Sequence, residues 1–447
     1  MIGNVDSGKS TMVGVMTKSI MDDGRGSARQ KVFNFSHEAA NGRTSSIGQE
    51  IMGFDDQDNQ VQMEHLNSNK NQSWAHVAQN SQRLVTFLDL CGHEKYLKTT
   101  MFGLVGLMPD YSMIVVGANM GVSKMTREHL GISLALGVPL FIVITKIDLA
   151  PDEKYQETLS VLTKILKSPQ AGKNPITIPR GEEGENTDMS VYARAMPDKV
   201  VCPIFSVSNV TGEGIPTLKK FMSLLKSRVS ISGQFGMKTD PVEFLIDGFY
   251  QVRGVGPVVA GTLLAGTVNP GATLLLGPNK QGQFDPVQVK GIHHKRVDVE
   301  EAVAGQAVCF AIKTQAKKEQ LKRNNFRKGM VMVDREAQPQ PIYDFEAEVV
   351  ILHHATSIRP NYQAVVHCGV IRQAAKVVEL DNEYLRSQDK GTIRFRFMYR
   401  PEFVKEGTTI LFREGRTKGL GVITRVFLPK STVNNKKANA AAANQNR

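Results

Sequence analysis

The chain contains 447 residues, with 55 Lys and Arg against 43 Asp and Glu, which gives a formal net charge of +12 with neutral histidines. A composition of 41% hydrophobic and 22% charged residues excludes a wholly disordered chain and a fibrous one. Because single hydrophobic cores stop growing near about 250–300 residues, the length indicates two to four domains. The positive charge is compatible with an anionic partner, but an ordinary basic protein is about equally expected.

Cysteine usage and hydropathy indicate the compartment. The four cysteines are widely separated and form no C-x-x-C pair, which favours a reducing compartment over a disulfide framework or a structural zinc site. No secretory signal pattern opens the chain. The most apolar stretch, residues 132–144, is broken by Gly-Val-Pro at 137–139 and is too short to span a bilayer. We therefore expect a cytoplasmic protein with no membrane partner.

The first part of the chain, to about residue 230, alternates β-branched runs with helical patterns. This alternation predicts an α/β domain with a doubly wound, mostly parallel sheet. Runs that are apolar on both faces are expected to be buried parallel strands at residues 84–88, 112–116, 140–144 and 203–207. Two polar stretches, residues 55–82 and 168–190, are expected to be surface loops.

From about residue 240 the pattern changes to short alternating strands separated by turns such as Asn269-Pro270-Gly271. No long helical period follows, so two all-β barrel domains are expected, divided near Gln338–Pro341. The predicted boundaries are 1–230 for the α/β domain, 240–336 and 342–428 for the two barrels, and 429–447 for a low-complexity, disordered tail.

A glycine-rich loop opens the chain. Gly3-Asn4-Val5-Asp6-Ser7-Gly8-Lys9-Ser10 fits G-x-x-x-x-G-K-[S/T], and a helical pattern follows directly, with Thr11 in its first turn. Glycines let backbone N–H groups approach phosphate oxygens, the lysine reaches the β- and γ-phosphates, and the serine hydroxyl is a ligand for Mg²⁺. The pattern therefore predicts that Gly3 through Thr11 bind a nucleotide.

Polar residues follow three of the expected strands. Asp89 and Gly92 belong to a D-x-x-G sequence, in which the carboxylate holds Mg²⁺ and the glycine N–H meets a γ-phosphate. Thr145, Lys146 and Asp148 end another strand, and the Asp148 carboxylate would accept two hydrogen bonds that guanine offers and adenine does not. Ser206-Val207-Ser208 ends a further strand and would offer a backbone N–H to guanine O6. Open α/β sheets bind ligands at this edge.

In this order the motifs resemble those of translational GTPases, the class of elongation factor Tu and elongation factor 1-alpha. The D-x-x-G-H form with His93 is typical of that class, and residues 254–261 and 412–421 resemble strands of its second and third domains. Residues 90–100 and 367–373 are most similar to the GTP-binding protein 1/2 subfamily.

The resemblance implies a monomeric P-loop GTPase that hydrolyses GTP to GDP and phosphate with Mg²⁺ as cofactor. His93 would orient the attacking water, and Lys9 would hold the phosphates as the second catalytic group. The implied partners are the ribosome and tRNA or another RNA. The alternative is a nucleotide-gated adaptor that recruits ribosome-rescue or RNA-decay factors and hydrolyses little GTP.

The chain departs from the pattern of this class at several positions. Residues 43–48 read R-T-S-S-I-G where elongation factors usually have R-G-I-T-I. Alignment on Arg43 and Ile47 makes Ser46 the switch hydroxyl for Mg²⁺, with Thr44 as the second choice. Thr145 replaces the usual asparagine, so one amide bond to the purine would be lost.

The start of the chain also departs from this class, which places a complete strand before the phosphate loop. Here only Met1 and Ile2 precede Gly3. Loss of a central strand would leave unpaired backbone groups and a gap in the core. We therefore expect a truncated product or a mis-set start.

The excess positive charge is unevenly distributed. Residues 391–447 contain 12 Lys and Arg against 3 Asp and Glu, and residues 280–330 contain 11 against 5. The remainder of the chain has a net charge of −3. The excess therefore lies in the expected barrels and tail, which predicts that those parts face RNA phosphates.

Overall fold

The computed structural model describes residues 1–62, 70–227, 236–314, 326–415 and 417–428. The chain forms two compact units, one of Met1–Asp240 with Thr262–Asn269 and Gly291–Cys309, the other of Pro241–Gly261, Pro270–Lys290 and Phe310 onward. The predicted boundary between two barrel domains does not separate these units, and the three-domain division stays a prediction. The predicted tail and Arg416 lie outside the described residues. In the described ranges, every helix is too short or too polar for a membrane crossing.

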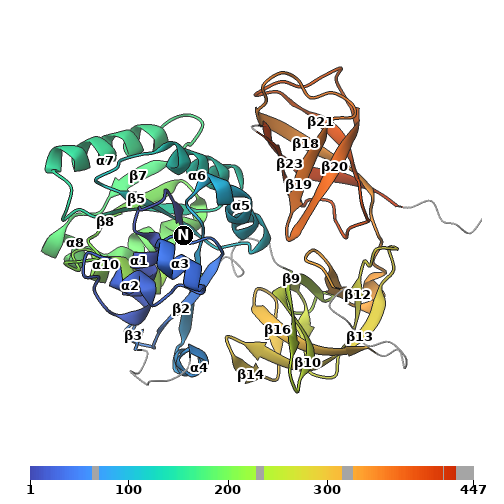
Figure 1. Cartoon of the computed structure of the whole chain (residues 1–447), viewed down its shortest axis with the longest axis horizontal. Helices are drawn as coiled ribbons and strands as arrows, with labels where there is room; N and C mark the ends of the chain where they lie inside the picture. The colour runs from blue at the N-terminus through green and yellow to red at the C-terminus, as the bar shows by residue number, and fades with distance from the viewer. Residues whose placement is uncertain (63–69, 228–235, 315–325, 416, 429–447) are drawn as a thin grey trace, which may run out of the picture. The chain divides into compact units, whose positions relative to one another are not determined.

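The first unit contains a five-stranded parallel sheet with helices on both sides (Figure 1). Every residue of its two middle strands β5 and β6 is buried, which explains their continuous apolar sequences. In spatial order the strands are β1 (Ile2–Gly3), β5 (Ser112–Gly117), β6 (Leu140–Thr145), β8 (Val201–Ser206) and β7 (Asn174–Thr177). The longer helices are α1 (Lys9–Lys18), α4 (Lys70–Gln79), α5 (Leu97–Gly106), α6 (Lys124–Ala135), α7 (Asp152–Leu166) and α10 (Ile215–Leu224). The shorter helices are α2 (Ser27–Gln30), α3 (Ser36–Asn41), α8 (Gly181–Asn186) and α9 (Met189–Ala195).

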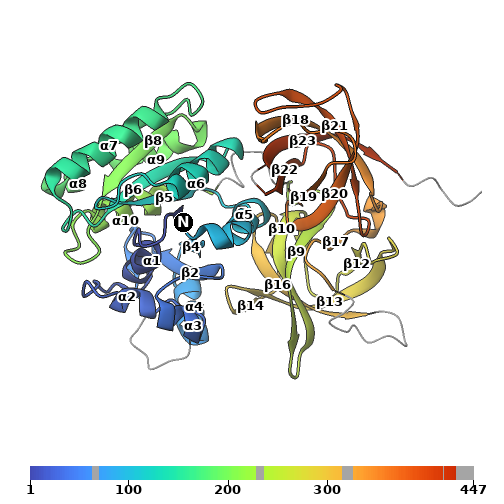
Figure 2. The same cartoon turned by 45° about the horizontal axis from the view of Figure 1, so that its top comes forward.

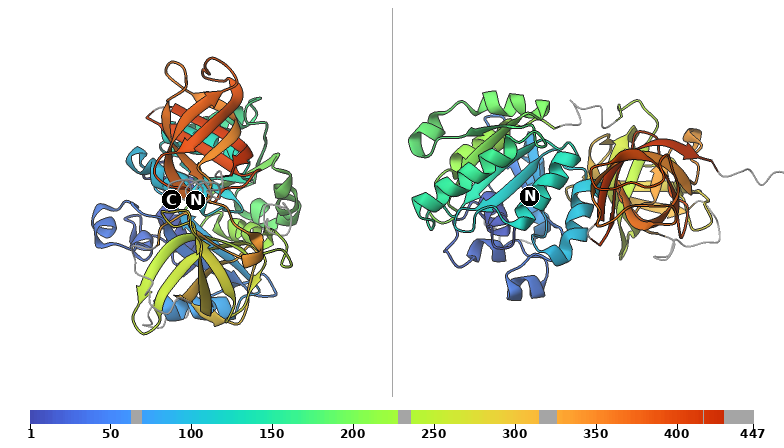
Figure 3. Two further views of the ribbon diagram at one scale, coloured as in Figure 1. Left: turned by 90° about the vertical axis from the view of Figure 1, so that its right-hand side faces the viewer. Right: turned by 90° about the horizontal axis from the view of Figure 1, so that it is seen from above.

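The alternation of side chains along each strand determines what each face of this sheet packs against. Val115, Val143 and Phe205 lie in one core with residues of α1 and α10, including Met16 and Phe221. The Phe205 and Phe221 rings are 4.9 Å apart between centroids. Helix α1, which follows the phosphate loop, therefore shares a packed core with strands of this sheet. Figure 3 shows from above the helices that lie on the two sides of the sheet.

A second sheet has the order β3-β2-β4 and comprises β2 (Gly48–Phe54), β3 (Gln60–Val61) and β4 (Arg83–Asp89). The expected strand at 84–88 is confirmed, but it pairs antiparallel with β2, so its assignment to the parallel sheet is wrong. Met1 links the two sheets: its terminal ammonium donates to Leu88 O at 2.7 Å, and Leu90 N–H donates to Met1 O at 3.1 Å. At the expected position of a longer first strand, β1 has two residues.

The two segments expected to be loops contain regular structure, so those expectations are wrong in part. Residues 55–82 include β3 and α4, and residues 168–190 include β7 and α8. The reason is that these elements bury few side chains. In the part of α4 whose burial is described, Trp74 and Val77 are buried and pack against Ile51 and Leu84. Strand β7 is exposed at both ends and half-buried between them. Because these segments are mostly polar, hydrophobic periodicity in the sequence does not predict their helices and strands.

The next part of the chain forms a seven-stranded sheet of order β12-β17-β9-β10-β16-β13-β14. Strand β12, at one edge of this order, also pairs with β13, which lies next to the strand at the opposite edge. The strands are β9 (Glu243–Val252), β10 (Gly256–Ala265), β12 (Thr273–Gly277), β13 (Asp285–His294), β14 (Val297–Val299), β16 (Ala307–Thr314) and β17 (Val331–Val333). A small sheet pairs β11 (Thr267–Val268) with β15 (Ala302–Val303).

The last strands close into a six-stranded barrel of order β18-β21-β20-β19-β22-β23, coloured orange to red in Figure 2. Its core contains the rings of Phe345, Phe395, Phe397 and Phe412. The strands are β18 (Asp344–His353), β19 (Gln363–Cys368), β20 (Ile371–Leu380), β21 (Lys390–Phe397), β22 (Thr409–Glu414) and β23 (Thr417–Phe427). The expected fold class, a parallel α/β domain followed by β-rich domains, is confirmed.

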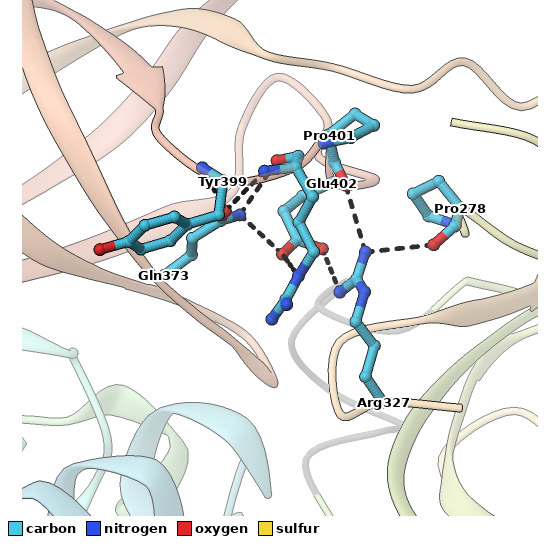
Figure 4. A network of polar contacts seen from close by, with 7 residues as sticks. Pro278, Arg327, Gln373, Tyr399, Pro401 and Glu402 are labelled. Atoms are coloured by element: carbon cyan, nitrogen blue, oxygen red, sulfur yellow. Dashed lines mark hydrogen bonds and ion pairs between the residues drawn. The ribbon is translucent and has the colours of Figure 1, made fainter. Parts of the chain in front are cut away.

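A buried ion pair joins the segment before β17 to the segment that follows β21 of this barrel (Figure 4). The Arg327 guanidinium donates to the Glu402 carboxylate at 2.5 Å. It also donates to the carbonyl oxygens of Pro278 and Pro401, both at 3.1 Å. The Gln373 amide donates to the other Glu402 oxygen at 2.8 Å. Glu402 is 1% exposed, so its charge depends on these partners.

Candidate functional site

The phosphate loop Gly3–Ser10 leads from β1 into α1, whose first residue is Lys9. Gly8 caps the helix with φ of 85°, a backbone conformation that favours glycine. Gly92 approaches the loop so closely that a Cβ there would lie 2.7 Å from Lys9 Nζ. The predicted Gly3–Thr11 loop and the D-x-x-G sequence therefore meet at one place, and the N-terminus of α1 supplies N–H donors for an anion.

Lys9 lies inside this loop. Its ammonium donates to Asn4 O at 2.6 Å and to Gly3 O at 3.2 Å, and its side chain is buried. Burial lowers the pKa of Lys9, while the nearby Asp89 carboxylate opposes that shift. The loop carbonyls thus hold a positive charge at the position where phosphate oxygens would bind.

Three oxygen-bearing side chains from separate segments converge beside Lys9. Ser10 Oγ donates to Asp89 Oδ2 at 2.5 Å, and Thr44 Oγ1 lies 2.8 Å from Ser10 Oγ and 3.3 Å from Asp89 Oδ2. Asp89 is buried, which raises its pKa against the opposing effect of Lys9, and its Oδ1 has no partner among the described residues. Two hydroxyls and a carboxylate with a free oxygen are the donors that Mg²⁺ prefers, so these residues fit that ion.

Ser46, the predicted Mg²⁺ hydroxyl, lies elsewhere. Glu38 Oε1 accepts hydrogen bonds from the N–H and Oγ of Ser45, at 2.8 and 2.9 Å, and from those of Ser46, at 3.0 and 2.9 Å. Burial favours protonation of Glu38, but these hydrogen bonds outweigh it and lower its pKa. Cys91 donates its thiol to Ser46 O at 3.3 Å, and burial raises the pKa of Cys91 to about 12. The structure therefore brings Thr44, the second choice, to Ser10 and Asp89.

The predicted base-binding residues lie at the ends of β6 and β8. Thr145 is fully buried and donates its hydroxyl to Ser7 O at 2.7 Å. The threonine thus ties this strand end to the phosphate loop in place of the usual asparagine. Lys146 follows with φ of 59°, and Asp148 is exposed at the rim, where its carboxylate is accessible.

The predicted donors of the third strand end are already engaged. Val207 N–H donates to Ile144 O at 2.8 Å and Ser208 N–H to Glu213 O at 3.0 Å, while the Ser206 hydroxyl lies 2.9 Å from that of Tyr155. These two N–H groups are therefore not free for guanine O6.

Asn209, which the sequence analysis missed, lies against the phosphate loop. A Cβ on Gly8 would be 3.4 Å from Asn209 Nδ2, and Asn209 Oδ1 is buried with no partner in the described ranges. The available signal was its place between a strand end and the turn Thr211–Gly214.

His93 lines the wall of the phosphate pocket and is exposed. Its Nδ1 accepts from Lys95 N–H at 3.0 Å, so the ring caps the short 3-10 helix Glu94–Tyr96. Asp6, with φ of 58°, lines the same pocket.

The pocket itself is lined by residues of the phosphate loop together with Thr44, Gly92 and His93. Three further residues line it that the sequence analysis did not assign: Arg29 of α2, with Gly42 and Arg43 before Thr44. Only proximity in the fold identifies Arg29, because no spacing motif includes it. In the described part of the chain, no cluster of three or more His, Cys, Asp or Glu side chains is placed to bind a metal.

Comparison with known proteins places this pocket in context. Residues 1–229 match the family model described as the elongation factor Tu GTP binding domain. The chain is 46% identical over 426 residues to GTP-binding protein 1 of Xenopus laevis, covering 95% of this chain and 62% of that protein. It is 41% identical over the same length to GTP-binding protein 2 of Homo sapiens, covering 68% of it. The chain thus spans about two thirds of the length of these relatives.

Solved structures share the fold at low sequence identity. A bacterial selenocysteine-specific elongation factor matches 99% of this chain and 60% of its own, with a TM-score of 0.64 and 19% identity. The Ski7 GTPase-like domain of S. cerevisiae, bound to GTP, matches 94% of this chain and 95% of its own, with a TM-score of 0.67 and 12% identity.

Proposed function

We propose that this chain, which belongs to the elongation factor Tu GTP-binding domain family and is a homologue of GTP-binding proteins 1 and 2, is a GTPase whose hydrolysis is coupled to RNA on the ribosome. The observation that carries the proposal is the convergence of Ser10, Thr44 and Asp89 oxygens beside the buried Lys9 ammonium. This arrangement supplies positioning and charge, which are what phosphoryl transfer requires of a protein.

Lys9 and the loop N–H groups hold the β- and γ-phosphates, and His93 orients the attacking water. Ser10, Thr44 and Asp89 would hold Mg²⁺, which neutralises phosphate charge when it is bound. Ser46 is the less favoured ligand because its hydroxyl is donated to Glu38. No covalent intermediate is needed, so a fixed geometry accounts for the catalysis.

Guanine selection rests on Asp148. An exposed carboxylate at this strand end accepts from N1–H and the 2-amino group of guanine, a pair of donors that adenine lacks. The Thr145 bond to Ser7 O fixes the strand end relative to the phosphates. Asn209, whose buried Oδ1 has no partner in the described ranges, follows Ser206–Ser208 in the chain and would take over the role first expected of them.

The coupling to RNA is supported by charge. The excess of Lys and Arg lies in residues 280–330 and 391–447, outside the phosphate site. An excess of Lys and Arg in these stretches of sequence suits phosphate backbones, and tRNA or ribosomal RNA is the partner that such a protein would meet in the cytoplasm.

The test is single-turnover GTP hydrolysis with and without ribosomes, for wild type and H93A. We expect ribosomes to accelerate the wild type by at least about tenfold, because an added partner completes the geometry around the attacking water. The H93A variant should lose that acceleration and keep GTP binding. The matched control is H353A, since His353 is an exposed histidine on β18.

The alternative function has its own signature in this experiment. Nucleotide binding with no acceleration by ribosomes, and with H93A equal to wild type, would replace the GTPase by a nucleotide-gated adaptor that recruits ribosome-rescue or RNA-decay factors.

A further inference from the structure

Arg29 is a cation at the phosphate pocket that the protein itself does not neutralise. It lines the pocket from α2, and neither a hydrogen bond nor an ion pair of its guanidinium is found among the described residues. Its Nε is buried without an acceptor. A guanidinium carries five N–H donors and is always charged, so leaving one buried donor unpaired costs free energy unless a ligand accepts it.

Two glycines fix the position of this guanidinium. A Cβ on Gly26 would lie 2.8 Å from Arg29 Cζ, and a Cβ on Gly42 would lie 3.0 Å from one of its terminal nitrogens. Both glycines have positive φ, of 96° and 63°. The Arg29 guanidinium therefore lies against glycine backbone on two sides. One of these glycines, Gly42, belongs to the segment that also carries Thr44.

The helix that carries Arg29 is held to the phosphate loop. The buried Asp22 carboxylate accepts from the N–H groups of Gly24 at 3.0 Å, Gly26 at 3.1 Å and Ala28 at 2.9 Å, which fixes the turn before α2. Helix α2 packs so tightly on α1 that a Cβ on Gly14 would collide with the Ala28 carbonyl. Because α1 begins in the phosphate loop, Arg29 is preorganised relative to the phosphates.

The other arginine of the pocket differs in these respects. Arg43 lines the same wall of the pocket, but its side chain is exposed. Arg25, in the same turn as Gly26, is exposed and does not line the pocket. Of these three arginines, Arg29 combines a fixed position with a guanidinium that has no partner among the described residues and lines the pocket.

We propose that Arg29 contacts the terminal phosphates of GTP and neutralises the charge that develops there during hydrolysis, so that this chain supplies an arginine to its own active site. The inference rests on the proposed GTPase function. A preorganised cation at the γ-phosphate stabilises the transition state more than the ground state, and it contributes little to GDP, which lacks that phosphate.

The experiment compares wild type, R29M and R25A. The affinities for a non-hydrolysable GTP analogue and for GDP are measured with fluorescent nucleotides, and single-turnover hydrolysis is measured without ribosomes. In R29M, which keeps an apolar stem of similar length, we expect analogue affinity to fall by about tenfold or more and hydrolysis by about a hundredfold. GDP affinity should change by less than about threefold, and R25A should equal wild type.

Two results for R29M would overturn the proposal. Equal analogue affinity and hydrolysis in R29M and wild type would exclude a phosphate contact. An equal loss of GTP-analogue and GDP affinity would reduce Arg29 to a packing residue. If R29M fails to fold, the R29K variant is used instead, because lysine keeps the positive charge without the paired N–H donors of a guanidinium. Wild-type hydrolysis in R29K would contradict a role of the guanidinium. A loss of hydrolysis with unchanged GDP affinity would support that role. Failure of the wild type itself to bind guanine nucleotides would overturn the proposed function as well, and is distinguishable because it appears before any variant is compared.

Discussion

At the scale of single residues, Glu38 determines which hydroxyl of residues 43–48 lies beside Ser10 and Asp89, the proposed ligands of Mg²⁺. Its buried carboxylate collects four hydrogen bonds from Ser45 and Ser46, and this leaves the preceding Thr44 directed to Ser10. Hydrogen bonds to an ionised acceptor are stronger than neutral ones, so this carboxylate is a firm anchor for the segment.

Replacing Glu38 should therefore weaken GTP binding specifically. In E38A the four donors lose their acceptor and Thr44 loses its position, so we expect the affinity for GTP with Mg²⁺ to fall by about tenfold, which corresponds to about 1.4 kcal/mol of positioning free energy. GDP affinity should change much less, because the switch hydroxyl serves the triphosphate state. Equilibrium binding of both nucleotides checks this. E38Q, which keeps an acceptor oxygen without the charge, should lie between wild type and E38A, and equal nucleotide affinities in E38A and wild type would refute the anchor.

His129 should make the stability of the first unit sensitive to acid. It is fully buried on α6, and Gly3 N–H donates to its Nδ1 at 3.2 Å. Burial and then the Lys9 charge lower the pKa of His129 to about 3. Between pH 6.5 and about 3 the unfolded chain binds a proton that the folded chain refuses, so stability falls as the pH falls, by up to about 1.4 kcal/mol per pH unit.

The check is urea unfolding across this pH range for wild type, H129Q and H353A. H129Q should show a shallower loss of stability on acidification than wild type, and the exposed-histidine variant H353A should follow wild type. Parallel curves for H129Q and wild type would show that His129 is not held neutral in the folded state.

At the scale of secondary-structure elements, the sequence predicted what periodicity and glycine spacing encode and missed what depends on contacts. The apolar runs at 112–116 and 140–144 became β5 and β6 because both faces are buried. Helices α4 and α8 were missed because polar side chains cover most of their surface, and only tertiary packing of residues such as Trp74 identifies α4.

The candidate site divides in the same way. Gly3–Thr11, Asp89 and Gly92 follow from spacing and meet in the structure. The position of Thr44 beside Ser10 depends on Glu38, and the position of Arg29 depends on Gly26 in the turn before α2 and on Gly42, which lies after α3. No local pattern carries such information.

The Arg327–Glu402 pair gives a prediction at this scale, since it joins the segment before β17 to the segment that follows β21 in the second unit. Burial raises the pKa of Glu402, and Arg327 opposes that shift, so each charge depends on the other. Removing one partner leaves an uncompensated buried charge, so R327M should lower the free energy of unfolding by about 3–5 kcal/mol.

Chemical unfolding of R327M, R327M/E402M and E383Q tests this. The double variant should recover much of the loss, because two apolar side chains leave no buried charge. E383Q removes the 80% exposed partner of a surface pair and should cost no more than about 1 kcal/mol. A cost of that small size for R327M would mean that the buried pair contributes little.

At the scale of the whole molecule, the uneven charge predicts salt-sensitive RNA binding through the β-rich part. Neutralising Arg413, Arg416 and Lys418 removes three of the positive charges of residues 391–447. Because each phosphate contact releases counterions, the slope of log affinity against log salt should become shallower by about two.

Titration of tRNA at several salt concentrations measures this slope. The matched control neutralises three lysines in and just after α7: Lys154, Lys164 and Lys167. That control should bind tRNA as wild type does. Unchanged affinity and slope in the variant of Arg413, Arg416 and Lys418 would show that RNA does not bind through these residues.

The central claim is that this chain binds guanine nucleotides through one rim formed by the phosphate loop and the strand ends. Its most direct test is the affinity of wild type and D148N for GTP, ATP and xanthosine triphosphate, because the Asp148 carboxylate matches the N1–H and 2-amino donors of guanine and an amide matches xanthine instead. We predict that wild type binds GTP more tightly than ATP. In D148N the affinity for GTP should fall by about a hundredfold, because two charge-assisted hydrogen bonds are lost, and the affinity for xanthosine triphosphate should rise. Equal binding of GTP and ATP by wild type, or unchanged GTP affinity in D148N, would contradict the account.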